Sequence, residues 1–162
     1  MEHQHHTMTT GEHSPKEIVK FIGVLVAIAL LSVLINRGAT GFMGVFFLVF
    51  AGFKLAGYTM FVEMFPTYDL VAGKWPTYAK IYPFIEVALG FLYLTNSIPL
   101  VRDLATVILM GVSSIGVARE LKRRRGIHCA CLGNIIKLPL STVSLVENLA
   151  MGLMALYMLI FS

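Results

Sequence analysis

The stretch that decides the fold is FMGVFFLVFAGFKLAGYTMFVEMF, residues 42–65. It is long enough to cross the hydrocarbon core of a bilayer as a helix, which takes about 20 mostly apolar residues. The stretch is dense in Phe, and Gly52 and Ala56 have the small-xxx-small spacing that lets a second helix approach closely. We therefore expect a membrane-spanning helix here, packed against a neighbour through this small-residue face.

The composition of the whole chain supports a membrane protein. Of its 162 residues, 57% are hydrophobic and 14% are charged, and the mean hydropathy is +0.77. A soluble domain carries about 25% charged residues. The net charge of +4 does not indicate nucleic-acid binding, because the basic residues flank apolar segments instead of lining one face. The expected partner is the lipid bilayer.

Four further apolar segments accompany this one. Residues 18–36 can span, whereas residues 83–95 are short for a span. Residues 101–121 predict another helix, and Ser141 is a suitable N-cap for a last helix that reaches Phe161. We expect five membrane helices in all.

The segments divide the chain into three parts. Residues 1–15 form a His- and Met-rich tail that we expect to be disordered, since nothing in it can bury a core. Residues 16–40 contain an N-terminal transmembrane helix, which shows no cleavage pattern and is expected to be retained. Residues 41–162 form the main membrane domain, in which the Trp and Tyr of the 66–80 connector belong at the headgroup level.

The basic residues predict the orientation. With five spans, one side of the membrane receives Lys16, Lys20, Lys74, Lys80, Lys122, Arg123, Arg124, Arg125 and Lys137, and the other side receives Arg37 and Arg102. The positive-inside rule then places the N-terminal tail at the cytoplasm and the C-terminus outside, in a multi-pass protein of a bacterial-type inner membrane. This assignment depends on residues 83–95 crossing the bilayer. Four other charged residues near predicted helix ends are expected to be interfacial, namely Glu63, Asp69, Arg102 and Asp103.

The only two cysteines are the main candidates for chemistry. Cys129 and Cys131 are separated by one residue, in a loop that follows a basic run and is expected at the cytoplasm. Two thiols this close can cycle between dithiol and disulfide, or bind a soft metal ion. A disulfide across one residue is strained, and strained disulfides tend to be oxidising or labile. The nearby Arg and Lys side chains favour the thiolate form.

A metal site is the second interpretation of the same residues. His128, Cys129 and Cys131 supply three local ligands suited to Cu⁺ or Zn²⁺. A fourth ligand can come from the tail, which is expected on the same side and contains His3, His5, His6 and His13. A cloned purification tag is the alternative explanation of the tail.

Three ionisable residues lie inside apolar segments, namely Lys54, Glu86 and Glu147. An unpaired charge there costs at least about 3 kcal/mol, so we expect Lys54 to pair with one of the two carboxylates. Such a pair either fixes helix packing or belongs to a proton or ion pathway. On the last helix, Met151, Met154 and Met158 share the face of Glu147. This Met face is either core filler or a guide for a soft cation.

Three strings resemble a known family. FFLVFAGFKL at residues 46–55 and YPFIEVALG at residues 82–90 resemble two helices of the DoxX/MauE group, and CACLG at residues 129–133 is similar to the Cys-Gly-Cys-Phe-Gly of its methylamine-utilisation members. The resemblance covers roughly residues 42–162. It also extends to a sub-branch in which a heavy-metal-associated domain precedes the membrane part. The first helix and the His-rich tail depart from the pattern.

The resemblance implies a fold and a role. The fold is an all-α integral membrane protein, a four-helix DoxX/MauE-like bundle with one additional N-terminal transmembrane helix. The methylamine branch is associated with disulfide formation in a methylamine dehydrogenase subunit, which implies thiol–disulfide transfer from Cys129 and Cys131 to a partner protein. The alternative function is heavy-metal binding or transport, in which a metal-chaperone partner, the tail, the two cysteines and the Glu147/Met face handle Cu⁺ or Zn²⁺.

Overall fold

The structure is a computed structural model that describes residues 15–34, 38–122 and 142–161. All regular structure in these ranges is helical, which confirms the all-α prediction. The elements are α1 (Pro15–Leu34), α2 (Gly38–Ala56), α3 (Tyr58–Met64), the 3₁₀ helix η1 (Phe65–Thr67), α4 (Pro76–Thr95), α5 (Pro99–Lys122) and α6 (Thr142–Phe161).

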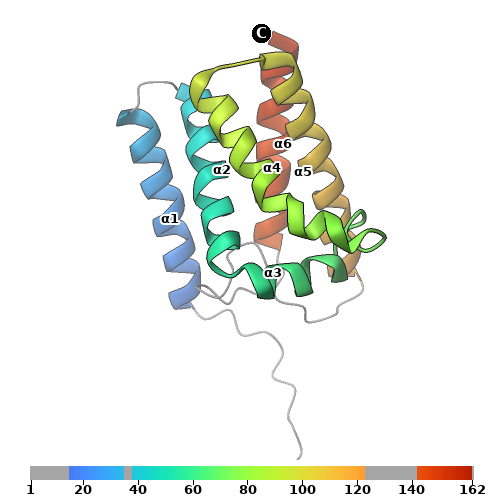
Figure 1. Cartoon of the computed structure of the whole chain (residues 1–162). Helices are drawn as coiled ribbons and strands as arrows, with labels where there is room; N and C mark the ends of the chain where they lie inside the picture. The colour runs from blue at the N-terminus through green and yellow to red at the C-terminus, as the bar shows by residue number, and fades with distance from the viewer. Residues whose placement is uncertain (1–14, 35–37, 123–141, 162) are drawn as a thin grey trace, which may run out of the picture.

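The long helices α1, α2, α4, α5 and α6 run side by side, while the short α3 lies across one end of the bundle (Figure 1). The closest backbone packing occurs within two pairs, α2 with α4 and α5 with α6, and α1 packs on the outside of α2. The turn between α4 and α5 and the end of α6 lie at the end opposite to α3 (Figure 1). Long side chains therefore fill the space between the two pairs.

The stretch 42–65 does not form one helix. It was expected to span as a unit, but α2 ends at Ala56, and Gly57 has non-helical dihedrals, φ −109° and ψ 35°. Glycine has low helix propensity and permits such a turn. Phe61 and Phe65 of the following segment are buried, and the Phe65 ring lies 4.5 Å from the ring of Tyr82 in α4. Burial of these rings beneath the bundle accounts for the change of direction.

The third long helix is longer than the apolar segment 83–95 indicated. It begins at Pro76, so the expected connector 66–80 ends at Trp75, and Pro83 lies inside the helix. A proline within a membrane helix is tolerated where neighbouring groups satisfy the backbone. Near this position the Tyr58 hydroxyl donates to the Lys80 carbonyl at 3.1 Å. The helix ends at Asn96, which caps α4 in the left-handed conformation, φ 54°.

Two glycines hold α2 and α4 close together. A Cβ atom on Gly44 would lie 2.7 Å from Leu94 Cγ and 3.1 Å from the Gly90 carbonyl, and one on Gly90 would meet Leu48 and the Gly44 carbonyl at the same distances. The expected contact face at Gly52 and Ala56 is wrong. Both residues are exposed, and nothing lies within 4 Å of a Cβ placed on Gly52. Small residues do mediate the close approach, but two turns earlier in α2.

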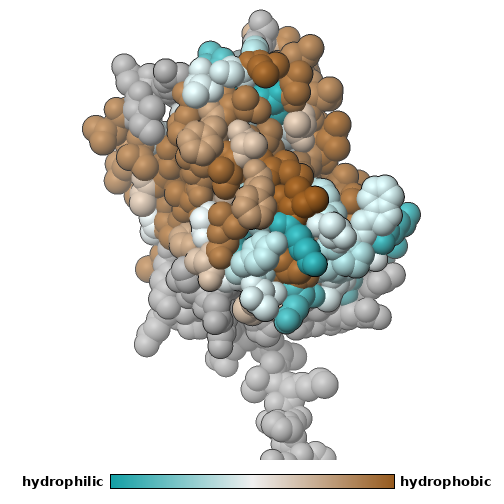
Figure 2. All heavy atoms as spheres, in the orientation of Figure 1, coloured by the Kyte–Doolittle hydropathy of each residue, from teal (hydrophilic) through white to brown (hydrophobic). Residues whose placement is uncertain are grey.

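The outside of the bundle is apolar. Hydrophobic residues cover most of the visible face, and the hydrophilic residues gather mainly at one lower corner (Figure 2). Exposed large apolar side chains occur on α1, α4, α5 and α6, among them Leu30, Val33, Phe84, Phe91, Ile108, Ile115, Leu153 and Ile160. A water-soluble monomer rarely exposes so much contiguous apolar surface. By length and composition, α2 and α5 are the two helices in the described ranges that qualify as membrane spans.

Candidate functional site

Lys54 and Glu86 form a buried ion pair between α2 and α4. Their exposed fractions are 5% and 2%, and the Lys54 ammonium donates to Glu86 Oε1. The same ammonium lies 4.8 Å from the centre of the Tyr82 ring, within the range of a cation–π interaction. The pairing expected from the cost of an isolated charge is thus present. The second oxygen of Glu86, Oε2, is buried without a hydrogen-bond partner.

Glu147 approaches this pair from the opposite side of the core. A cavity of about 20 Å³ is bordered by Lys54, Glu86, Glu147 and Asn148, together with Met110 and other side chains of the core. Glu147 Oε1 is closed off from solvent and has no hydrogen-bond partner. Since Lys54 and Glu86 belong to one helix pair and Glu147 to the other, the cavity lies at the interface of the two pairs.

A line of polar side chains connects this region with the surface near α3. The Tyr82 hydroxyl lies 3.4 Å from Ser113 Oγ, which in turn donates to Asp69 Oδ2 at 3.5 Å. Asp69 Oδ1 accepts the backbone N–H groups of Val71 and Ala72, both at 2.9 Å. Burial raises the pKa of Asp69, against the opposing effect of these hydrogen bonds. Asp69 also lines a surface depression of about 180 Å³.

The sequence does not predict this line of hydrogen-bonded polar side chains. Asp69 was expected near the membrane interface, and nothing in the sequence indicated that its side chain is buried within the protein. Ser113 carries no sequence signal beyond being a small polar residue in an apolar helix, and Tyr82 resembles any other aromatic residue of a core. Only Glu86 gave a hint, because Tyr82 precedes it by four positions and therefore shares its helix face.

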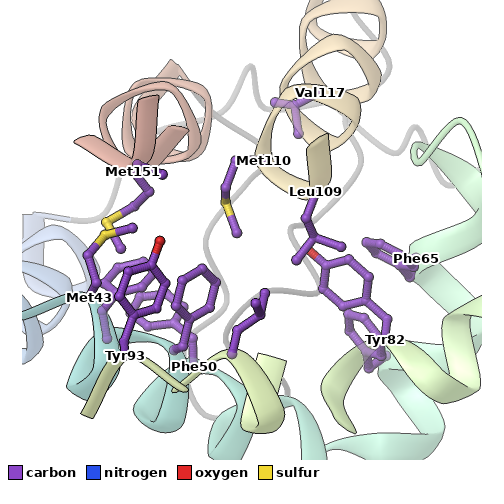
Figure 3. Packing of buried hydrophobic residues seen from close by; sticks show 14 of the residues in the cluster. Met43, Phe50, Phe65, Tyr82, Tyr93, Leu109, Met110, Val117 and Met151 are labelled. Carbon is purple, nitrogen blue, oxygen red and sulfur yellow. The ribbon is translucent and has the colours of Figure 1, made fainter. Parts of the chain in front are cut away.

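The Met face of α6 contacts the apolar core. Met151 is 3% exposed, while Met154 and Met158 are partly buried and pack against the core cluster. Figure 3 shows Met151 pointing from α6 towards Met43 of α2, with Met110 of α5 reaching into the same space. These contacts fit the filler interpretation, and the role of a guide for soft cations stays a prediction.

Arg102 and Asp103, expected at the membrane interface near a helix end, have side chains buried within the protein. They are 2% and 0% exposed and form an ion pair in which Arg102 Nε donates to Asp103 Oδ1 at 2.8 Å. A second guanidinium nitrogen donates to Asn96 Oδ1 at 2.8 Å, and the guanidinium lies 4.4 Å from the centre of the Tyr93 ring. The pair is buried because the turn after α4 supplies Asn96 as a polar partner.

The cysteines and histidines lie outside the described residues. Cys129, Cys131 and His128 belong to the segment that joins α5 to α6, and His3, His5, His6 and His13 precede α1. Their proposed roles therefore stay predictions, as does Ser141 as an N-cap. Among the described residues, no group of three or more His, Cys, Asp or Glu side chains is placed to hold a metal ion.

Taken together, the apolar exterior and the buried charged core are those of a helical membrane protein, with the lipid bilayer as its partner. The chain matches the family described as methylamine utilisation protein MauE over residues 20–161, and it belongs to that family. This confirms the resemblance to MauE. No match was found among curated proteins or among solved structures.

Proposed function

We propose that this protein carries out thiol–disulfide exchange at the membrane through Cys129 and Cys131. The observation that supports the proposal is the presence of a single Cys-x-Cys pair in a chain of the MauE family. In the exchange, a Cys129–Cys131 disulfide and a partner dithiol give the Cys129/Cys131 dithiol and a partner disulfide. Two electrons and two protons pass from the partner to this pair, and the reverse reaction has the same balance.

The proposal includes a topology. The helices α1, α2, α4, α5 and α6 each have 19 to 24 residues, about 28–36 Å at 1.5 Å per residue, so five spans are feasible in length. With five spans, the N-terminal tail and the cysteine segment share one side, which the basic residues assign to the cytoplasm. The cytoplasm keeps thiols reduced, whereas disulfide donation to an exported protein needs the outer side.

The decisive experiment measures bound metal and free thiols on the same purified, untagged sample, with Cys129→Ser/Cys131→Ser as the control. We expect no stoichiometric metal, together with two thiols that are lost on oxidation and recovered on reduction in the wild type alone. The alternative is heavy-metal handling by the tail and the two cysteines. Stoichiometric copper or zinc that the control variant loses would establish that alternative and overturn the redox proposal.

A second experiment assigns the side of the membrane. A membrane-impermeant thiol reagent applied to intact cells should leave Cys129 and Cys131 unlabelled if they face the cytoplasm, and should label them after permeabilisation. Labelling of intact cells would mean that the two cysteines face the outside, opposite to the proposed topology. It would also remove the conflict between the location of the cysteines and a role in disulfide donation to exported proteins.

A further inference from the structure

The cavity between the helix pairs has an unbalanced set of charges. The groups that face it are Lys54 from α2, Tyr82 and Glu86 from α4, Ser113 from α5, Glu147 and Asn148 from α6, and Tyr68 from the connector that also holds Asp69. Lys54 is the single cation among these described residues. With both glutamates ionised, one ammonium would face two carboxylates, and one negative charge would stay uncompensated in the bilayer.

The hydrogen-bond geometry shows a matching deficit of donors. The Lys54 ammonium donates to Glu86 Oε1, while Glu86 Oε2 and Glu147 Oε1 are both buried acceptors without a partner. Buried carboxylate oxygens are normally hydrogen-bonded. A proton on one of the two carboxyl groups would supply the missing donor and cancel the excess charge at the same time.

The cavity can connect the two carboxyl groups. Its volume of about 20 Å³ has room for one water molecule, and the few polar side chains in its mostly apolar lining can act as hydrogen-bond partners of that water. We infer that Glu86 and Glu147 share one exchangeable proton beside Lys54, and that this proton exchanges with bulk water along Tyr82, Ser113 and Asp69. The site binds a proton, and it is built entirely from residues outside the cysteine segment.

The spacing of the hydroxyl groups supports the route. The Tyr82 hydroxyl and Ser113 Oγ lie 3.4 Å apart and either can donate to the other, while Ser113 Oγ also lies 3.5 Å from Asp69 Oδ2. The line therefore leads from the Tyr82 ring, which lies under Lys54, to a carboxyl group at the edge of the surface depression. Gly116 brings α5 close to this edge, because a Cβ there would lie 2.4 Å from the Tyr68 carbonyl.

Infrared spectroscopy of the protein in lipid tests the inference, since a protonated carboxyl group has a carbonyl band that a carboxylate lacks. At neutral pH we expect Glu86→Gln and Glu147→Gln each to lose one carboxyl equivalent of this band relative to the wild type, because the remaining carboxylate pairs with Lys54. Lys54→Met should gain one equivalent. Glu63→Gln, which changes an exposed glutamate of α3, is the matched control and should leave the band unchanged.

Retention of the whole band in both Gln variants would overturn the inference. Loss of the band in only one of the two variants would also overturn it, because the proton would then be fixed on that one residue. Circular dichroism verifies that each variant folds. The route is tested by the rate of hydrogen–deuterium exchange at the carboxyl group, measured as the shift of the band in D₂O. Ser113→Ala and Asp69→Asn should slow this exchange, and an unchanged rate would exclude the route. Cys129→Ser/Cys131→Ser should keep the band, so the proton site and the thiol function can fail independently.

Discussion

The two buried charged clusters of this bundle differ in how their hydrogen bonds are satisfied. At the end where α4 turns into α5, Arg102 donates from three nitrogens to Asp103 and Asn96, and both carboxylate oxygens of Asp103 are used. Towards the end where α3 lies, Lys54 pairs with Glu86, but one oxygen of Glu86 and one of Glu147 have no partner. All of these hydrogen-bonding groups are paired in the first cluster, whereas the second cluster has unpaired carboxylate oxygens and borders a cavity.

The difference follows from where the residues come from in the chain. Asn96, Arg102 and Asp103 lie within eight positions of one another, so one turn and the start of one helix assemble the first cluster. The second cluster combines residues from α2, α4 and α6. A locally assembled, fully bonded ion pair is typical of a structural element. A cluster drawn from both helix pairs, with an unbalanced charge, is where we place function.

The largest expected effect is at the first cluster. Arg102→Met leaves Asp103 buried without a cation and should lower the free energy of unfolding by about 3–5 kcal/mol. Denaturant unfolding in detergent, followed by circular dichroism, measures it. Arg102→Met/Asp103→Leu removes both charges and should recover most of the loss. A double variant as unstable as the single one would show that the pair does not act as a unit.

The same test at the second cluster should give a smaller loss. Lys54→Met should cost about 3 kcal/mol, and Lys54→Met/Glu86→Met should restore most of it. Glu147→Gln should change the free energy of unfolding by no more than about 0.5 kcal/mol, because glutamine imitates a protonated glutamate. A loss at Glu147→Gln as large as that at Lys54→Met would mean that Glu147 is an ionised partner of Lys54.

The close approach of α2 and α4 lies next to the second cluster. Gly90 lies one turn after Glu86, and Gly90→Ala forces Leu48 and the Gly44 carbonyl to move, at a cost of about 1–3 kcal/mol. Gly52→Ala adds the same methyl group at an open position inside α2, where Ala has the higher helix propensity, and should leave the protein as stable as the wild type or up to about 1 kcal/mol more stable. Equal losses in the two variants would exclude close helix packing as the cause.

The smallest expected effect concerns pH. Burial raises the pKa of Asp69 above its ordinary value of 3.8, so the folded protein holds this proton more tightly than the unfolded chain does. The associated stability is fully present when the pH is below the pKa of Asp69 in the unfolded chain. It is lost as the pH rises through the pKa of Asp69 in the folded protein. Asp69→Asn keeps an oxygen for the N–H groups of Val71 and Ala72, and it should remove this pH dependence from thermal unfolding curves. An unchanged pH profile would contradict the assignment.

The sequence predicts a helical membrane protein and the pairing of Lys54 because both follow from the cost of burying charge and polar backbone in lipid. It does not predict the break at Gly57, since the stretch 42–65 is mostly apolar on both sides of that residue and the turn depends on the burial of Phe61 and Phe65 under α4. Arg102 illustrates the same limit. Proximity to a helix end predicts its depth at the membrane interface, but only the structure shows that its side chain is buried and donates to Asn96.

The unequal lengths of the two clearest spans have a consequence for the surrounding lipid. The 19 residues of α2 extend about 28 Å, and the 24 residues of α5 extend about 36 Å. A bilayer whose hydrocarbon thickness of about 30 Å suits α2 leaves α5 to tilt or to project beyond it. The projecting turn would carry Arg119 and Lys122, which suit the phosphate depth of a leaflet. Membrane thickness would therefore adjust the tilt of α5, and with it the depth of this basic turn.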